Sequence, residues 1–332
     1  MQAVVIREHG GPEVLRLEDR ERPRPGPGEA LVRVRACALN HLDIWVRLGI
    51  PGVKFPLPLV PGSDVAGVVE DPGPAGDEFP AGSPVLVAPG LSCGRCRECA
   101  AGRDNLCPRY GILGETRDGG CAEYVAVPAV NLLPFPEGLP FESAAAIPLV
   151  FLTAWHMVVT RGGVRPGETV LVQAAGSGIG TAAIQIAKLW GATVIATAGS
   201  DGKLERAKEL GADHGINYAT ADLAAEVRRI TGKRGVDLAI DHVGEATWDA
   251  VIRSLARGGR LVTCGATTGA EARTNLRYVF FKNLSVLGST MGSRSELYEV
   301  LAHVRAGRLR PVLDRTFPLA EAAAAHRHLE AR

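Results

Sequence analysis

The segment from Thr169 to Ala198 constrains the fold most, because its pattern predicts a strand, a glycine turn, a helix and a second strand. The β-branched run Thr169–Gln173 ends at the small-residue segment Ala174–Gly180, and apolar residues at helical spacing follow as far as Gly191. Small residues let the backbone approach a phosphate, and the first N–H groups of the helix face such an anion. The turn is therefore predicted to bind a pyrophosphate, although glycine turns of this kind also occur without a ligand.

Strand and helix patterns alternate after Ala198, which predicts a parallel sheet with helices on both of its faces. The expected strands are 214–218, 236–242, 260–264 and 284–288, and the expected helices between them are 203–210, 222–231 and 245–256. In an open sheet of this α/β class, the ligand binds at the carboxyl ends of the strands. The second half of the chain is therefore expected to be a doubly wound cofactor domain.

The first 135 residues are rich in proline and glycine and carry short alternating strands, which predicts an irregular, mostly antiparallel β-barrel. Within it, Cys37–Arg47 has the pattern of a strand end that runs into a short helix, so its polar residues are expected to face a cleft. Two helices at 296–306 and 320–330 are expected to pack back on this part. The predicted domains are 1–140 with 290–332, and 141–289.

Four cysteines lie close together in the segment 90–110, at positions 93, 96, 99 and 107. This spacing lets Cys93, Cys96, Cys99 and Cys107 surround one zinc ion as a closed tetrahedral site, which leaves no position open for a substrate. The alternative is a set of four thiols without a metal. The spacing favours one structural zinc per chain.

Composition excludes several classes of protein. The 332 residues have a formal net charge of +1, so no basic excess points to nucleic acid. The chain starts without an apolar signal region, and its sequence suggests no apolar run long enough to span a bilayer. Crowded cysteines favour a metal site in a reducing compartment over disulfides. We therefore expect a cytoplasmic protein that acts on a small molecule, without nucleic-acid or membrane partners.

Taken together, these motifs resemble the medium-chain dehydrogenase/reductase family, which includes the zinc-containing alcohol dehydrogenases. The resemblance rests on the barrel start, Pro61–Val69, the four-cysteine lobe, the glycine turn, and Leu210–Ala212 before Ile216–Tyr218. It implies a GroES-like catalytic domain, a Rossmann domain that binds a nicotinamide cofactor, and hydride transfer in the cleft between them.

The chain departs from the zinc alcohol dehydrogenases at the positions where that resemblance places a catalytic zinc. Asn40 stands in place of the first cysteine, Gly62-Ser63-Asp64 replaces a Gly-His-Glu segment, and residues 149–155 contain no cysteine. A hydroxyl and an amide are poor zinc ligands. The pattern is similar to the quinone oxidoreductase branch, with the structural zinc lobe retained. A metal on His41, Asp64 and His156 remains an alternative, although His156 and His242 by themselves are more typical of structural histidines.

The end of the second strand of the cofactor domain bears on the choice of cofactor. Sites for NAD usually have an acid there, but this chain has Ala198, followed by Ser200 and Lys203. Tyr218 matches a tyrosine that the quinone reductase branch uses near the 2′-phosphate. These residues favour NADPH over NADH, although Asp201 is an unfavourable neighbour and each could be merely structural. The other predicted cofactor contacts are Thr153, Gly176, Ser177, Gly178, Ile179, Gly180, Val243 and Gly265.

The predicted activity is hydride transfer from NAD(P)H to a quinone, enone or carbonyl compound without a catalytic zinc. Asn40 and His41 would stabilise the developing negative charge, and solvent or Asp43 would relay the proton, with Asp64 in the same candidate site. The candidate pocket residues, each of which could instead belong to the core, are Trp45, Tyr110, Phe151 and Met291.

Two other functions remain open. One is an alcohol dehydrogenase with unusual catalytic metal ligands, and the other is a crystallin-like or regulatory protein that binds NADPH without turnover. For each of them the resemblance implies a homodimer or homotetramer, in which strand 284–288 pairs between subunits.

Overall fold

The computed structural model describes residues 1–331, which form two compact units. The first unit comprises Met1–Leu149, Ser293–Arg305 and Arg310 onward, and the second comprises Val150–Gly292 with Ala306–Leu309. The sequence pattern places the change of domain after residue 140. In the structure the first unit continues to Leu149, because helix α3 (Phe141–Ala145) packs against strands β3 (Glu29–Ala38) and β4 (Asp64–Asp71) of that unit.

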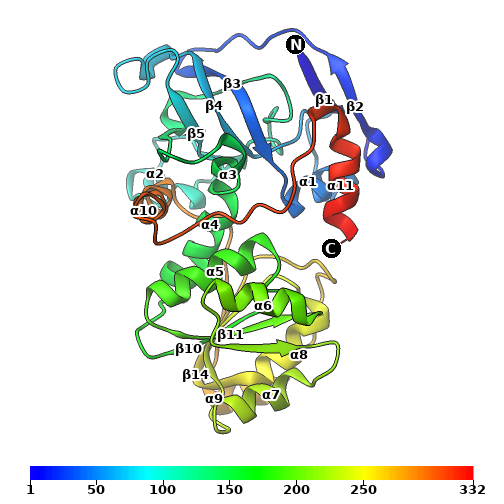
Figure 1. The fold of residues 1–332 in the computed structure, drawn as a ribbon, viewed down its shortest axis with the longest axis vertical. Helices are drawn as coiled ribbons and strands as arrows, with labels where there is room; N and C mark the ends of the chain where they lie inside the picture. Colours follow the sequence, from blue (N-terminus) through cyan, green and yellow to red (C-terminus); the bar gives the residue numbers. More distant parts are fainter. Residues whose placement is uncertain (332) are drawn as a thin grey trace. The chain divides into compact units, whose positions relative to one another are not determined.

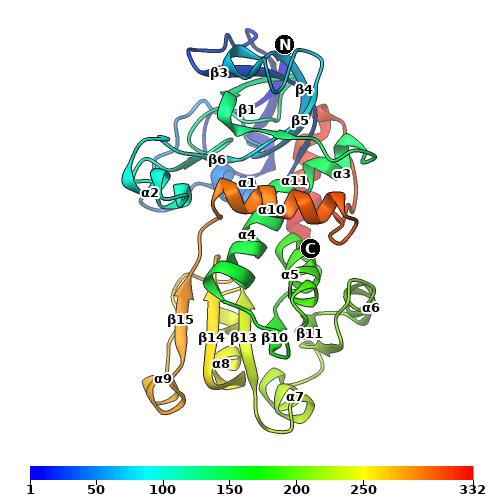
Figure 2. The same cartoon turned by 90° about the vertical axis from the view of Figure 1, so that its left-hand side faces the viewer.

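The second unit is built on a six-stranded parallel sheet in the order β12-β11-β10-β13-β14-β15 (Figure 2). Its strands are β10 (Thr169–Val172), β11 (Thr193–Ala198), β12 (His214–Asn217), β13 (Val236–Asp241), β14 (Leu255–Thr263) and β15 (Ser285–Gly288). This order, in which β10 and β13 are central neighbours, is that of a doubly wound Rossmann sheet. The fold predicted for the second half of the chain is confirmed.

Helix α4 (Pro148–Trp155, which begins in the first unit) and a π-helical turn at His156–Arg161 precede β10. The helices that connect successive strands of the sheet are α5 (Gly178–Leu189), α6 (Asp201–Glu209), α7 (Leu223–Ile230), α8 (Glu245–Ser254) and α9 (Leu276–Lys282). Helix α5 ends where the pattern predicts, since Gly191 adopts a φ of +72°, a conformation that glycine reaches without steric cost. Leu171, Ile195 and Ala239 are completely buried beneath these helices, so the sheet carries the core of this unit.

The first unit is built on a five-stranded antiparallel sheet in the order β8-β3-β4-β5-β9, accompanied by the two-stranded pairs β1-β2 and β6-β7. Figure 1 labels strands β1 to β5 of this unit. Its strands are β1 (Gln2–Ile6), β2 (Leu15–Asp19), β3 (Glu29–Ala38), β4 (Asp64–Asp71), β5 (Pro84–Val87), β6 (Gly90–Leu91), β7 (Gly111–Ile112), β8 (Tyr124–Pro128) and β9 (Leu132–Pro134). The buried side chains of Val32, Val65 and Val85 lie in its core. The antiparallel architecture expected for the first domain is confirmed.

Helices complete the first unit and carry two of the candidate sites. They are α1 (His41–Leu48), α2 (Arg97–Ala100), α3, α10 (Arg294–Arg305) and α11 (Ala322–Ala331), with short 3-10 turns between some of the strands. Helix α1 begins directly after β3, at the junction that the sequence predicts, and α2 lies in the cysteine lobe. The last two helices belong to this unit although they follow the cofactor domain in the sequence.

One helical run is longer and more apolar than the sequence analysis expected of any segment. Phe141–Arg161 is long and apolar enough, by length and composition alone, to cross a bilayer, so the expectation that no run reaches this length was wrong. However, 72% of its most apolar window is buried inside the protein. Because a buried core helix has the same composition, the run is accounted for by packing of the fold.

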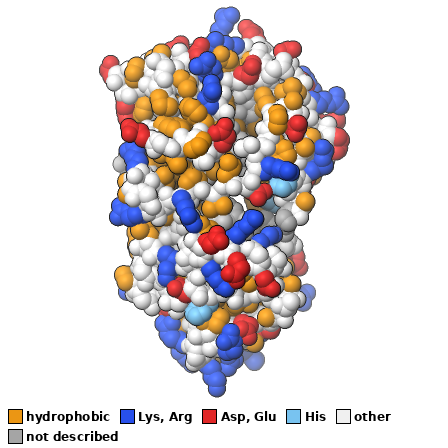
Figure 3. Space-filling view, viewed as in Figure 1, with side chains coloured by type: hydrophobic (Ala, Val, Ile, Leu, Met, Phe, Trp, Pro, Cys, Tyr) orange, Lys and Arg blue, Asp and Glu red, His pale blue; other side chains and the backbone are white. Residues whose placement is uncertain are grey.

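The charged side chains are distributed as the near-zero net charge suggests. On the face shown in Figure 3, basic and acidic groups are interspersed among the described residues. Within helix α7, Arg229 pairs with Glu226 at 2.7 Å. This face therefore has no extended basic surface of the kind that binds a nucleic-acid backbone.

Candidate functional site

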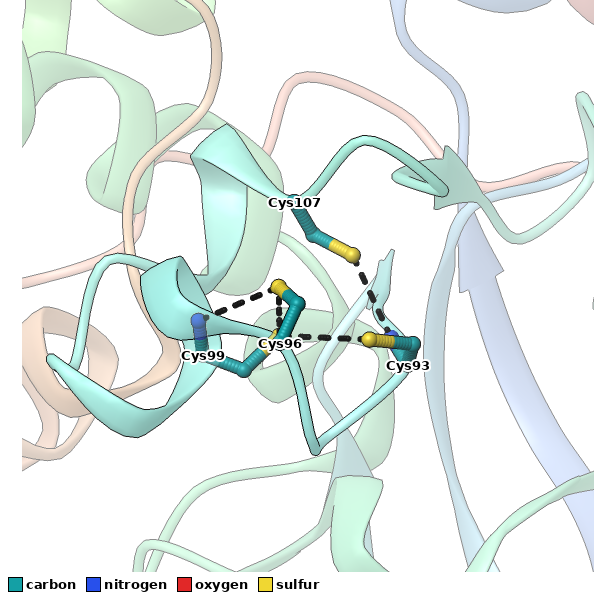
Figure 4. A group of neighbouring side chains, drawn as sticks. All are labelled: Cys93, Cys96, Cys99 and Cys107. Atoms are coloured by element: carbon teal, nitrogen blue, oxygen red, sulfur yellow. Dashed lines mark hydrogen bonds between the residues drawn. The ribbon is translucent and has the colours of Figure 1, made fainter.

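The four cysteines of the lobe converge in the structure (Figure 4). Their sulfur atoms all lie within 4.8 Å of one another, and the Sγ atom of Cys99 is 3.4 Å from that of Cys96 and 3.9 Å from that of Cys93. A tetrahedral zinc ion with Zn–S bonds of about 2.3 Å needs sulfur separations of about 3.8 Å. The quartet therefore has the size and donor set of a structural zinc site.

The surroundings lower the pKa of two of the four thiols, Cys93 and Cys99, and raise that of Cys96; the thiolate is the form that binds zinc. Backbone N–H groups of Cys93 and Arg109 each donate to Cys107 Sγ at 3.4 Å. Hydrogen bonding by the Arg95 backbone, followed by the Arg109 side chain, lowers the pKa of the Cys93 thiol to about 5. A metal site needs three or more His, Cys, Asp or Glu side chains whose ligand atoms lie close together. Among residues 1–331, the cysteine quartet is the group that meets this condition.

A different arrangement occupies the segments where the resemblance would place a catalytic zinc. Asn40 precedes α1, and its Nδ2 donates to Asp64 Oδ2 at 2.9 Å. The other oxygen of Asp64 accepts the backbone N–H of Leu149 at 2.8 Å. All three candidate segments therefore meet at the Asp64 carboxyl group, through hydrogen bonds between protein atoms.

Asp43 stabilises this junction by accepting two backbone hydrogen bonds. Its Oδ2 accepts the backbone N–H of Asn40 at 2.7 Å, and its Oδ1 accepts that of Gly62 at 2.9 Å. Gly62 has a φ of +102°, and a Cβ atom there would lie 2.6 Å from the sulfur of Cys37, so only glycine fits. Because both oxygens of Asp43 accept backbone N–H groups, its geometry favours a positioning role over the predicted proton relay.

Burial dominates the electrostatics of the two acids. Asp43 and Asp64 are each 1% exposed, and burial raises the pKa of Asp43 to about 6 and that of Asp64 to about 8, against the lowering effect of their hydrogen bonds. Burial therefore shifts both acids toward the neutral form, and Asp64 more than Asp43. Ser63 beside it is also 1% exposed, and its hydroxyl has no hydrogen-bond partner among the described residues.

The structure places the predicted pocket residues in both units. Trp45 packs edge-on against His41, the first residue of α1, with ring centroids 5.2 Å apart. Tyr110 is enclosed near the cysteine lobe, where a Cβ atom at Gly90 would lie 2.4 Å from its hydroxyl. Phe151 is 1% exposed and Met291 is 6% exposed. Their role as substrate contacts stays a prediction.

The glycine turn has the geometry of a phosphate cradle. Ser177 is the N-cap of α5, and its Oγ accepts the N–H of Gly180 at 2.9 Å. A Cβ atom at Gly180 would lie 2.4 Å from the carbonyl oxygen of Ala174, so glycine is required there. The N–H groups of Gly178 and Ile179 open the helix and have no intrahelical acceptor, which leaves them for an anion.

Two residues predicted to select the cofactor lie beside the turn and the end of β11. The aliphatic chain of Lys203 runs past Gly176, since a Cβ atom there would be 3.2 Å from Lys203 Cδ. The hydroxyl of Tyr218 would lie 3.0 Å from a Cβ atom at Gly199. Ser200 is the exposed N-cap residue of α6, and its side chain makes no capping hydrogen bond.

Asp201, the unfavourable neighbour in the sequence, has a hydrogen-bond donor of its own. Its Oδ1 accepts the side-chain N–H of Asn217, at the end of β12, at 2.8 Å. The amide of Asn217 is neutral and leaves the negative charge of Asp201 in place. Asp201 is therefore still an unfavourable neighbour for a 2′-phosphate at this edge.

The remaining predicted cofactor residues lie around the carboxyl ends of the strands. Val243 follows β13, and its N–H donates to Asp241 Oδ1 at 2.7 Å. Gly265 follows β14, and its carbonyl oxygen accepts the hydroxyl of Thr263 at 3.4 Å. Thr153 is 4% exposed, and its hydroxyl lies 3.9 Å from the sulfur of Met291. Their contacts with a cofactor stay predictions.

One contact at this end of the sheet was not predicted from the sequence. His242 follows β13 directly, and its Nε2 lies 2.8 Å from Ser177 Oγ at the N-cap of α5. The available signal was its position immediately after a buried strand, where ligand-facing residues of an α/β sheet occur. The pattern alone had favoured a structural histidine.

Comparisons with known proteins agree with this architecture. Residues 26–137 match the family described as alcohol dehydrogenase GroES-like domain, and residues 178–306 match the family described as zinc-binding dehydrogenase. An alcohol dehydrogenase of Geobacillus stearothermophilus is 33% identical over 95% of this chain and 92% of its own length. A quinone oxidoreductase of Pongo abelii is 31% identical over 99% of this chain and 94% of its own length.

A solved structure titled as an NAD-dependent alcohol dehydrogenase is 56% identical to this chain, with a TM-score of 0.96 over 100% of this chain and 96% of that one. Relatives that align over nearly the full length at this identity share the family as well as the fold. The chain is therefore an oxidoreductase of the medium-chain dehydrogenase/reductase family, within the zinc-containing alcohol dehydrogenase superfamily.

Proposed function

We propose that the protein is an NADPH-dependent reductase that transfers hydride to a quinone, enone or carbonyl compound without a catalytic zinc. The observation that carries the proposal is the junction at Asp64, where Asn40 and Leu149 donate hydrogen bonds to the two carboxyl oxygens. The Asn40 amide and the Ser63 hydroxyl are poor zinc ligands, and both oxygens of the Asp64 carboxyl group already accept hydrogen bonds from protein atoms. The cysteine quartet would hold one structural zinc, closed to substrate.

The chain's own groups then stabilise the charge that develops on the acceptor oxygen. Bound NADPH supplies the hydride. Asn40 Nδ2 carries two hydrogens, of which Asp64 accepts one, so the second can be donated to a substrate oxygen. The hydrogen bond from the backbone N–H of Asn40 to Asp43 holds that backbone in place. The buried Ser63 hydroxyl is a further candidate donor to the substrate. His41 at the start of α1 or solvent would deliver the proton.

The assay that tests this proposal is NADPH oxidation by a panel of quinones and enones, before and after exchangeable metal is removed by mild chelation. We expect turnover to survive chelation, because no step passes through an exchangeable metal. Oxidation of simple alcohols that is abolished by chelation and restored by zinc would support the alternative, an alcohol dehydrogenase with unusual metal ligands. Cofactor binding without turnover on any acceptor would support the non-enzymatic alternative.

The preference for NADPH is supported by the groups around the end of β11. Ala198 places no carboxylate there, and Lys203 and Tyr218 lie beside Gly176 and Gly199. An ammonium and a hydroxyl are suitable partners for a 2′-phosphate. The 56% identical structure is titled NAD-dependent, so the preference of the present protein must be measured directly.

Replacing Lys203 by alanine should raise the dissociation constant of NADPH about tenfold and change that of NADH by less than about twofold, because only NADPH has the phosphate that the ammonium would contact. Fluorescence titration measures both constants. Lys208→Ala is the matched control, since Lys208 is on the same helix but pairs with Glu205 at 2.7 Å. Tighter binding of NADH than of NADPH by the unmodified protein would overturn the preference.

An assembly of subunits is also part of the proposal. Strand β15 forms one edge of the sheet, with helix α9 beside it (Figure 2). Val286 of β15 is exposed, and so are Leu276, Phe280 and Phe281 of α9. An uncovered apolar edge of this kind is suited to pairing with a second copy of the chain. We therefore expect a homodimer or homotetramer by analytical ultracentrifugation, and a monomer would contradict it.

The expected location is the cytoplasm. The described cysteines are all free, in keeping with a reducing cytoplasm.

A further inference from the structure

The contact between His242 and Ser177 joins two separate parts of the cofactor domain. His242 directly follows β13 and is 8% exposed, and Ser177 caps the helix that follows β10. The imidazole Nε2 lies 2.8 Å from Ser177 Oγ. A side chain from one strand end therefore contacts the hydroxyl that begins the predicted phosphate cradle.

The number of hydrogen bonds that the Ser177 hydroxyl can make is limited. A serine hydroxyl has one hydrogen to donate and two lone pairs, and one lone pair already accepts the N–H of Gly180 at 2.9 Å. If Nε2 of His242 is an acceptor, Ser177 donates its only hydrogen to the ring. If Nε2 carries a hydrogen, it donates to the second lone pair, and the hydroxyl hydrogen of Ser177 must point to another acceptor.

A bound pyrophosphate selects between these two cases. Its oxygens only accept hydrogen bonds, and the opening N–H groups of α5, from Gly178 and Ile179, already face the place where it would lie. An additional donor there lowers the free energy of the bound state, so binding favours the form in which the ring donates. Neutral histidine with Nε2–H and protonated histidine both meet this requirement.

We propose that His242 is a positioning residue for the cofactor, which donates to Ser177 Oγ and thereby directs the Ser177 hydroxyl hydrogen toward a pyrophosphate oxygen. The inference rests on the proposed use of a nicotinamide dinucleotide, but it applies to NADPH and NADH alike, since both contain the pyrophosphate. It gives a function to a buried histidine that the reaction itself does not require. It also predicts that His242 and Ser177 act as one unit.

The test compares dissociation constants of NADPH and NADH for four variants of the whole protein. His242→Leu and His242→Asn both remove the donor, because leucine has none and asparagine is too short to reach Ser177. We expect each to weaken both cofactors about tenfold. His242→Gln places an amide N–H near the former Nε2 and should stay within about threefold of the unmodified protein. Ser177→Ala should weaken binding at least as much as His242→Leu does, because it removes the donating hydroxyl itself and the cap of α5.

Three further measurements separate positioning from a general structural effect. The double variant His242→Leu/Ser177→Ala should bind no more weakly than Ser177→Ala alone, because His242 acts only through the Ser177 hydroxyl. ADP-ribose, which contains the pyrophosphate, should show the same loss, and adenosine, which lacks it, should not. The asparagine variant keeps the test decisive if the leucine variant does not fold.

Unchanged cofactor affinity in folded His242→Leu or His242→Asn protein would overturn the inference, as would equal losses for adenosine and ADP-ribose. Failure of glutamine to preserve binding would also contradict it, because the donor would then not be the property that matters. If the unmodified protein bound neither NADPH nor NADH, the proposed function itself would be wrong. The two failures are therefore distinguishable.

Discussion

Replacing Cys107 by serine should abolish binding of the proposed structural zinc and lower the thermal unfolding midpoint by roughly 10 °C. The reason is that the lobe 90–110 contains only very short helices and strands around the cysteine quartet, so a bound metal would supply much of its stability. Cys107 is 5% exposed, and its sulfur accepts the backbone N–H groups of Cys93 and Arg109. A serine oxygen would lie at a different distance from these two donors, because the C–O bond is shorter than the C–S bond. Elemental analysis and differential scanning calorimetry measure the two effects.

A matched control is available because three cysteines lie outside the lobe. Cys264 follows β14 in the other unit and is not part of the quartet, so Cys264→Ser should retain one zinc per chain. Retention of stoichiometric zinc by Cys107→Ser, or loss of zinc from Cys264→Ser, would contradict the assignment of the four ligands. Two tightly bound zinc ions in the unmodified protein would instead indicate a second metal site.

Replacing Asn40 by alanine should reduce the turnover of the quinone or enone acceptor about 100-fold while the dissociation constant of NADPH changes by less than about twofold. The substitution removes the amide that donates to Asp64 and, in our proposal, to the substrate oxygen. The hydrogen bond from the backbone N–H of residue 40 to Asp43 would remain, because it does not involve the side chain of Asn40. Steady-state kinetics and cofactor titration separate the two effects.

The control for this substitution is Asn275→Ala, which removes another helix-capping asparagine, in the cofactor domain, whose side chain accepts the N–H of Arg277 at 3.0 Å. That variant should lose some stability and keep its turnover. A turnover within about threefold of the unmodified protein for Asn40→Ala would exclude the amide as a charge-stabilising group. A large change in NADPH binding would point to a disturbed fold rather than lost chemistry.

Local patterns in the sequence were sufficient for the features whose residues are close together in the chain. The cysteine quartet follows from spacing alone, since Cys93, Cys96 and Cys99 are brought together by one turn of chain and α2. The strand, glycine turn and helix around Ala174–Gly180 likewise follow from periodicity and from residues that stop a helix. Helix α9 was missed, because its large apolar residues are exposed and leave no buried face to produce a pattern.

The tertiary structure decided how distant residues meet. The hydrogen bond between His242 and Ser177 exists because β13 and β10 are neighbours in the sheet, although they are far apart in the sequence. The convergence of Asn40 and Leu149 on Asp64 depends on the pairing of β3 with β4 and on the packing of α3 against both. Spacing along the chain determines which residues a short segment can bring together, whereas strand order and packing determine which segments become neighbours.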